Sequence, residues 1–178
     1  MLTDSEIQKA LKVKDIKISP YDKSQLESGN YRVKLGSKLL IPNKGLTIKI
    51  DEPSDQTLYE EFDLKKSSYI LKPKEFLLGQ TLEKIGVNKN IAGILDGRST
   101  FARLGVSIHQ SSQFIAPGQD FHIITLEIYN AGEFNVELKY ECIIGKIIFF
   151  QFNELNNRGY DDYGRYKGQK ETTGARLS

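Results

Sequence analysis

Apolar and polar side chains alternate along several short stretches of the chain. An apolar residue stands at every second position in residues 31–35, 46–50 and 136–140. Alternation of this kind is typical of a strand with one buried face. Turn-forming residues also occur along the chain, at Pro42-Asn43, Pro73, Pro117-Gly118 and Ala131-Gly132. Many short strands separated by such turns predict an all-β fold, either a sandwich or a barrel.

The start of the chain has a helical pattern instead. Thr3 and Glu6 have the spacing of a capping box, in which each side chain bonds the backbone N–H of the other residue. Ile7, Ala10 and Leu11 then fall on one helical face. We therefore expect one short N-terminal helix attached to an all-β body.

Length and charge limit the class of protein further. The 178 residues fit one domain, residues 1–178. Lysine and arginine total 25 against 23 acidic residues, a net charge of +2. This balance argues against a nucleic-acid partner, because nucleic-acid binders usually carry a basic stripe. A small anionic ligand remains compatible, since a few arginines are enough for one phosphate chain.

The two ends of the chain carry different signals. The amino terminus has no signal-peptide pattern, and no stretch of about 18 apolar residues occurs, so we expect a cytoplasmic protein with no membrane segment. Residues 153–178 are polar and contain four glycines. They predict either a disordered end or a mobile tail that closes over a ligand.

Residues 97–105 interrupt the alternation with two arginines and two hydroxyl side chains between glycines. Arg98 and Arg103 flank Ser99 and Thr100. A short helical turn there would direct backbone N–H groups and these side chains at an anion. Two interpretations stay open: a solvated turn with a structural ion pair, or a clamp for phosphate and base. The planar, permanently charged arginine suits the second.

Glu127 is the candidate catalytic carboxylate. It lies in the apolar stretch 121–130, where Leu126 and Ile128 belong to the predicted core face. Thr125 shares the opposite face with Glu127. A strand glutamate is most often simply solvated. In so apolar a strand, it can instead act as a general base.

Several enzyme motifs are missing from the sequence. Zinc-dependent nucleobase deaminases need H-x-E and P-C-x-x-C. This chain has one cysteine, Cys142, and neither His109 nor His122 begins an H-x-E motif. We therefore expect no zinc site of that kind, and we expect Cys142 to be a buried structural thiol. Walker A, G-x-S-x-G and Rossmann glycine patterns are also absent.

Residues 97–105 and the run Thr125-Leu126-Glu127 resemble the signature of the dCTP deaminases. Further matches follow in order along most of the chain: Leu2-Thr3-Asp4, Ile18-Ser19-Pro20-Tyr21-Asp22, Tyr31-Arg32-Val33-Lys34-Leu35-Gly36, Glu75-Phe76-Leu77-Leu78-Gly79, Ile144-Gly145, Tyr166-Lys167-Gly168-Gln169 and Gly174-Ala175-Arg176. The resemblance implies a distorted jelly-roll, or β-sandwich, of the dUTPase type. It also implies a homotrimer with active sites between subunits.

The activity implied by the resemblance is hydrolysis of the C–N bond of a cyclic amidine. Such an enzyme converts dCTP to dUTP and ammonia, with Mg²⁺ bound through the substrate triphosphate and no zinc. Glu127 corresponds to the general acid/base. Ser99 and Arg103 correspond to the groups that position the water and stabilise the intermediate.

The resemblance also implies a set of nucleotide-binding residues: Arg98, Ser99, Thr100, Arg103, Thr125, Leu126, Glu127, Tyr160, Arg165 and Gln169. The first three correspond to the triphosphate cradle, and the strand at Thr125 to the backbone that reads the cytosine edge. Arg165, where the family prefers lysine, and Gln169 correspond to tail residues that close on the nucleotide. Tyr160 and Tyr163 both fit the spacing of an expected tail tyrosine.

The chain departs from the family pattern between Ser111 and Phe121. The family reads T-A-x-x-I-D-P-G before an aromatic residue, whereas Ala116 stands at the position of the aspartate. One residue is also inserted before Glu127. That aspartate normally touches the sugar 3′-hydroxyl. Three alternatives therefore stay open: a dUTP pyrophosphatase, alone or combined with deamination; a nucleotide-binding member with altered catalysis; and an enzyme for another nucleotide.

Overall fold

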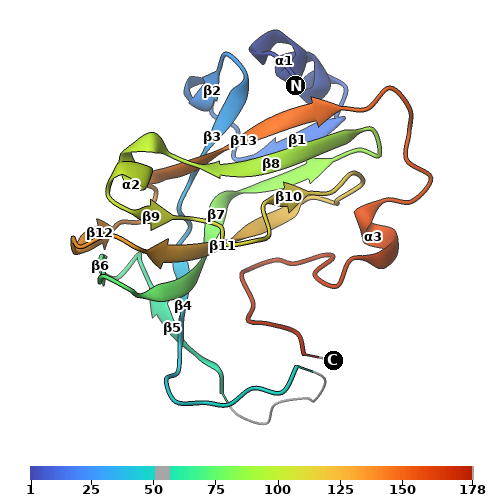
Figure 1. Cartoon of the computed structure of the whole chain (residues 1–178). Helices are drawn as coiled ribbons and strands as arrows, with labels where there is room; N and C mark the ends of the chain where they lie inside the picture. The colour runs from blue at the N-terminus through green and yellow to red at the C-terminus, as the bar shows by residue number, and fades with distance from the viewer. Residues whose placement is uncertain (51–56, 178) are drawn as a thin grey trace.

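The computed structural model describes residues 1–50 and 57–177 (Figure 1). Its strands are β1 (Ile16–Ser19), β2 (Leu26–Glu27), β3 (Asn30–Lys34), β4 (Lys38–Pro42), β5 (Tyr59–Asp63), β6 (Tyr69–Leu71), β7 (Phe76–Val87), β8 (Ile91–Gly97), β9 (Val106–Ser107), β10 (Phe114–Ile115), β11 (His122–Asn130), β12 (Val136–Leu138) and β13 (Ile143–Gln151). The helical segments are α1 (Asp4–Lys12), η1 (Lys23–Gln25), α2 (Ser99–Arg103) and α3 (Tyr160–Tyr163). None of the described helices combines the length and apolarity needed to cross a membrane.

Two large antiparallel sheets form the body of the protein. One has the strand order β5-β4-β7-β11-β9, with β1 also paired to β7, and the other has the order β10-β8-β13-β3-β2. Strands β6 and β12 form a small third sheet. Buried side chains from both large sheets join one hydrophobic cluster, with Leu77 and Leu126 from the first and Val33 and Phe149 from the second. The fold is therefore an all-β sandwich, which confirms the sequence prediction.

Strand β11 has the two faces that its sequence predicts. Leu126 and Ile128 are fully buried in the core, while Thr125 and Glu127 lie on the outer face and are partly exposed. The strand pairs with β7, with Glu127 opposite Leu78. The register shifts between Ile123 and Thr125, which marks a β-bulge. Because of this bulge, the residues before Thr125 do not follow the same alternation of faces as the residues after it.

Helix α1 begins at the predicted capping box. Thr3 accepts from the Glu6 backbone N–H through its side chain, and the Thr3 N–H donates to Glu6 Oε2 at 2.8 Å. Ile7 and Ala10 are buried, as their spacing requires. Cys142 is partly buried against the same core, and burial raises the pKa of its thiol. The helix and its capping box are as predicted, whereas Cys142, predicted as buried, is only partly buried.

The predicted strand at residues 46–50 is wrong, because the structure gives these described residues no strand. They follow β4, whose pairing with β5 ends at Pro42 and Tyr59. Their apolar side chains are exposed, at 38% for Leu46, 40% for Ile48 and 76% for Ile50. Alternation alone does not make a strand, since the backbone groups also need a neighbouring strand as hydrogen-bond partner.

The core also holds a buried carboxylate, Glu83 of β7. Its side chain is fully buried, and it accepts from Gln25 Nε2 at 2.8 Å and from the Lys34 backbone N–H at 3.0 Å. Burial raises the pKa of Glu83, and these two hydrogen bonds oppose that rise. The carboxylate thus ties η1 and β3 to β7.

We expect the substitution Glu83→Ala to lower the free energy of unfolding by about 2–4 kcal/mol, because it opens a cavity and leaves the Lys34 N–H without its acceptor. A urea titration measures this loss. The matched control is Glu61→Ala, which removes an exposed carboxylate paired with Lys38 at 2.6 Å and should cost about 1 kcal/mol or less. Equal losses in the two variants would contradict a structural role for Glu83.

Candidate active site

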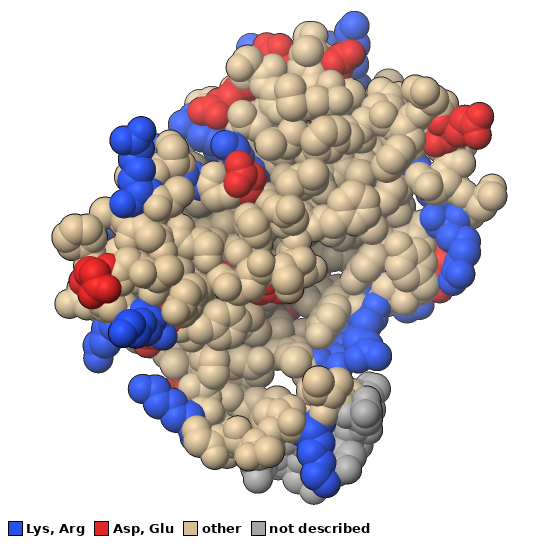
Figure 2. Space-filling view, viewed as in Figure 1, with Lys and Arg blue, Asp and Glu red and all other residues tan. Residues whose placement is uncertain are grey.

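A cavity of about 550 Å³ lies between β11, the segment 110–115 and the C-terminal tail. Figure 2 shows it as a hollow beside the tail, in a largely uncharged face. Its volume lies within the range typical of small-molecule sites, roughly 300–1,000 Å³. Among the described residues that line it, Glu127 is the one carboxylate and none is a lysine or arginine.

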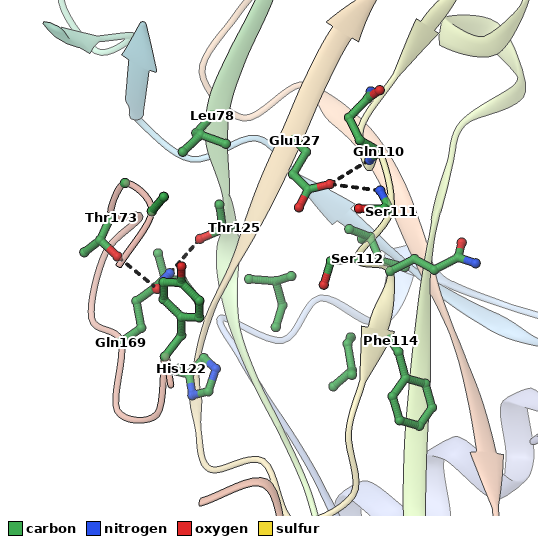
Figure 3. Close-up of a pocket in the computed structure, with 18 of the residues that line it drawn as sticks. Leu78, Gln110, Ser111, Ser112, Phe114, His122, Thr125, Glu127, Gln169 and Thr173 are labelled. Atoms are coloured by element: carbon green, nitrogen blue, oxygen red, sulfur yellow. Dashed lines mark hydrogen bonds between the residues drawn. The ribbon is translucent and has the colours of Figure 1, made fainter. Parts of the chain in front are cut away.

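Glu127 is anchored at one end of the cavity (Figure 3). Its Oε2 accepts from the backbone N–H of Gln110 at 2.7 Å and of Ser111 at 3.2 Å. The Glu127 backbone N–H donates to Ile108 O at 2.9 Å, which joins the strand to the segment before Gln110. Both side-chain bonds end on Oε2, and an ionised carboxylate has lone pairs on both oxygens. The Oε1 atom can therefore bind a water or take a proton.

The tail packs along the cavity on the side opposite the 110–115 segment. Gln169 Nε2 donates to Thr125 Oγ1 at 2.7 Å, and Figure 3 shows the two side chains meeting beside β11. Thr172 donates through its hydroxyl to the same Thr125 oxygen at 3.1 Å and through its N–H to Gln80 Oε1 at 2.9 Å. Gln169 and Thr172 are both buried. These contacts show a tail that packs against β11, and its closure over a ligand stays a prediction.

The beginning of α3 is held against the turn before β11. The Tyr160 N–H donates to Pro117 O at 2.8 Å, and a Cβ atom added to Gly118 would lie 2.6 Å from the Gly159 Cα. This close approach requires glycine at position 118, where φ is also positive at +72°. Tyr160 lines the cavity, whereas Tyr163 is 57% exposed and lies outside the lining. The geometry therefore favours Tyr160 as the tail tyrosine of the site.

The predicted site residues fall into two groups in one chain. Thr125, Glu127, Tyr160 and Gln169 come together around the cavity. The remaining predicted residues are outside the lining: Arg98, Ser99, Thr100, Arg103, Leu126 and Arg165. The α2 residues of this second group are exposed, and Figure 1 shows α2 on the opposite side of the view from α3.

Two members of that second group have evident roles elsewhere in the chain. The Leu126 side chain belongs to the hydrophobic core, so only its backbone can take part in a site. The Arg165 guanidinium donates to Arg176 O at 2.8 Å on the exposed side of the tail.

The sequence prediction missed His122, which lines the cavity and is 6% exposed. A period of two places His122 on the face of the core residue Leu126. The bulge between Ile123 and Thr125 breaks this period, so His122 and Thr125 both line the cavity. Burial lowers the pKa of His122, and Asp161 and Asp120 oppose this effect. A β-bulge leaves no periodic pattern in the sequence. The one sequence signal for it was the residue inserted before Glu127.

The lowered pKa of His122 predicts a pH-dependent contribution to stability. Above its ordinary pKa of 6.5, the imidazole is neutral in both folded and unfolded chains. As the pH falls below 6.5, the unfolded chain binds a proton before the folded one, so the folded state loses stability. We expect wild type to lose more unfolding free energy than His122→Gln over this window. Urea titrations between pH 7.5 and about pH 5 test this, and parallel curves would contradict it.

The fold and the site together define a β-sandwich protein of the dUTPase-like class with a small-molecule cavity beside its central strand. The chain belongs to the dCTP deaminase-like family, whose model matches residues 1–152. The match ends where the tail begins.

Individual relatives agree with this assignment. A dCTP deaminase of the dUMP-forming type from Tropheryma whipplei (strain Twist) is 31% identical over 178 residues, covering 97% of this chain and 90% of the relative. A dCTP deaminase from Shewanella amazonensis is 32% identical over 190 residues, covering 99% and 97%.

A solved structure supports the fold. The 2′-deoxycytidine 5′-triphosphate deaminase from Agrobacterium tumefaciens superimposes with a TM-score of 0.66 at 18% identity. The match covers 88% of this chain but spans only 49% of that one, about half of its length. At this identity, the likeness shows the shared dUTPase-like fold.

Proposed function

We propose that this protein is a cytoplasmic enzyme that deaminates dCTP to dUTP and ammonia, with Glu127 as general acid and base. The observation that carries the proposal is the position of Glu127. Two backbone N–H groups hold its carboxylate in the wall of a cavity that fits a nucleoside. The chain that builds this site is 31–32% identical to dCTP deaminases over nearly its whole length.

The reaction needs one water and one carboxylate that shuttles its proton. The water oxygen attacks ring carbon C4 of cytosine while Glu127 takes a proton from the water. Glu127 then passes this proton to ring nitrogen N3. The second proton of the former water moves, again through Glu127, to the amino group, the C–N bond breaks, and ammonia leaves a carbonyl at C4. Positioned proton transfer of this kind contributes roughly 10²–10⁴-fold.

Three further groups would hold the water and the developing charge. The Ser112 backbone carbonyl lies in the segment that lines the cavity next to Glu127 and can accept from the water. Ser99 would orient the same water, and the Arg103 guanidinium would stabilise the intermediate, since fixed donors that face developing charge lower the barrier.

We propose that a second copy of the chain supplies the α2 residues. A triphosphate needs cationic partners, and the described residues that line the cavity include no lysine or arginine. Ser99, Thr100 and Arg103 on α2 and Arg98 at its N-cap are exposed and lie outside the lining of the cavity of their own chain. A closed ring in which α2 of one subunit faces the cavity of the next would complete the site. The homotrimer implied by the resemblance has this form.

Magnesium fits this site only when it is bound to the phosphates of the nucleotide. The described residues contain no group of three or more His, Cys, Asp or Glu side chains arranged to hold a metal ion. Mg²⁺ often binds through substrate phosphates with few protein ligands, so the triphosphate would carry it here and the metal would screen phosphate charge. We propose that zinc has no part in the reaction.

We propose dUTP, rather than dUMP, as the product. Relatives of both kinds exist, because the Tropheryma whipplei protein is named as dUMP-forming and the Shewanella amazonensis protein is not. Ala116 is buried at the position of the family aspartate and cannot orient a hydrolytic water. Asp120 does not replace it, because its side chain is 64% exposed and lies 4.0 Å from Lys17 Nζ.

We therefore expect no pyrophosphate from dUTP and magnesium on the timescale of deamination. A coupled pyrophosphate assay, run beside an ammonia assay on dCTP, measures both rates on one preparation. Pyrophosphate release at a rate comparable to ammonia release would make the protein a bifunctional enzyme. Pyrophosphate from dUTP without ammonia from dCTP would make it a dUTP pyrophosphatase.

A further inference from the structure

Two buried polar side chains at the end of the cavity away from Glu127 have no partner. Gln119 and His122 both line the cavity, and each is only 6% exposed. Within the described residues, Gln119 Nε2 and His122 Nδ1 are buried atoms with no hydrogen bond. A buried polar atom without a partner costs about 1–3 kcal/mol, so each one calls for an explanation, and these two are the ones that line the cavity.

The surrounding backbone holds this pair in place. The Gln119 N–H donates to Ala116 O at 3.2 Å, and Gln119 O accepts from the Val87 N–H at 3.0 Å. The Tyr160 ring of the tail lies against His122, with 6.2 Å between the ring centroids. The two orphaned atoms therefore belong to a turn and a strand that backbone hydrogen bonds hold in place, and the tail packs against them.

The position of the pair along β11 points to one part of a nucleotide. Four residues of strand lie between His122 and Glu127, so at the usual rise per residue their Cα atoms are at most about 16 Å apart. Figure 3 shows the two side chains well apart along β11, with His122 near the lower end of the strand and Glu127 further up. One nucleoside contacts both ends only with its base at one and its sugar at the other. Glu127 takes the base end, because it must reach ring atoms C4 and N3.

We propose that Gln119 and His122 bind the sugar 3′-hydroxyl of the substrate. This inference rests on the proposed function, in which the substrate is a 2′-deoxynucleotide with one sugar hydroxyl. A hydroxyl both accepts and donates, so it can accept from Gln119 Nε2 and donate to His122 Nδ1. Ala116, at the start of the same turn, has no side-chain atom that could do this.

A binding experiment with matched nucleotides tests the proposal. Glu127→Gln serves as the background, so that the nucleotide is not consumed, and calorimetry with magnesium compares dCTP with dideoxycytidine triphosphate, which lacks the 3′-hydroxyl. In this background, dCTP should bind about threefold to tenfold more tightly than the dideoxy nucleotide. Adding Gln119→Leu or His122→Phe should weaken dCTP and leave the dideoxy nucleotide almost unchanged, so that the ratio approaches one.

The possible outcomes separate this proposal from the proposed function. Gln151→Leu, the same change at an exposed position at the end of β13, should keep the ratio of the background. If neither cavity variant changes this affinity ratio, the sugar subsite is overturned, although the proposal that the cavity binds a nucleotide is not. If Gln119→Leu weakens the binding of both nucleotides equally, the affinity ratio of dCTP to the dideoxy nucleotide in His122→Phe decides whether the sugar subsite exists. Binding of neither nucleotide to the wild-type protein would overturn the proposed function itself.

Discussion

Replacing Glu127 by glutamine should lower the rate of dCTP deamination by at least about 100-fold, because glutamine cannot carry the proton between water, ring and leaving group. We expect the variant to fold. Glutamine keeps one oxygen that can accept from the Gln110 and Ser111 N–H groups, as Glu127 Oε2 does. Binding of dCTP should also persist. Steady-state ammonia release gives the rate, and calorimetry gives the affinity.

A matched control separates this effect from a general loss of charge. Glu133 is exposed in the loop after β11, and Glu133→Gln removes the same charge without touching the cavity. Its rate should equal that of wild type. If Glu127→Gln keeps more than about a tenth of the wild-type rate, the proton-transfer role assigned to Glu127 is wrong.

Two inactive variants should regain activity when their subunits are mixed. Glu127→Gln damages the cavity of its own chain, and Arg98→Ala damages the α2 that we propose serves a neighbouring cavity. In a ring with one site at each interface, random exchange of equal amounts gives intact Glu127 beside intact Arg98 in about one quarter of the sites. Mixed and re-equilibrated protein should therefore recover up to about a quarter of the wild-type rate.

The control for this experiment keeps every site incomplete. Glu127→Gln mixed with the double variant Glu127→Gln, Arg98→Ala contains no intact Glu127, so it should remain inactive at any ratio. Light scattering on the same samples should give the mass of three chains. A monomer, or no recovery after proven subunit exchange, would contradict the shared site.

The sequence predicted the N-terminal helix and the strand that carries Glu127, but not strands β7 and β10, which also line the site. Helix α1 follows from Thr3 and Glu6, because a capping box is a local pattern. The outer face of β11 follows from alternation after Thr125. Residues 46–50 have the same alternation but form no strand, since a strand depends on a neighbour far away in sequence. His122 was missed because one bulge reverses the alternation at Ile123.

The arrangement of the site residues could not be predicted from one chain. The resemblance placed Arg98 and Glu127 in one site, while the structure places Glu127 at the cavity and Arg98 outside its lining. Period and spacing do not tell which copy of the chain supplies a residue, because assembly depends on surfaces. The resemblance implied sites between subunits, and this arrangement stays a proposal. Of the tail residues, Tyr160 and Gln169 reach the cavity, and Arg165 bonds Arg176 within the tail instead.

The most direct test of the central claim is incubation of the purified protein with dCTP and magnesium in water labelled with heavy oxygen. The products are then identified by mass spectrometry and an ammonia assay. Our account predicts ammonia and dUTP in equal amounts, with one labelled oxygen in the uracil base and none in the phosphates. Unchanged dCTP, or a label found in the phosphates without release of ammonia, would contradict it.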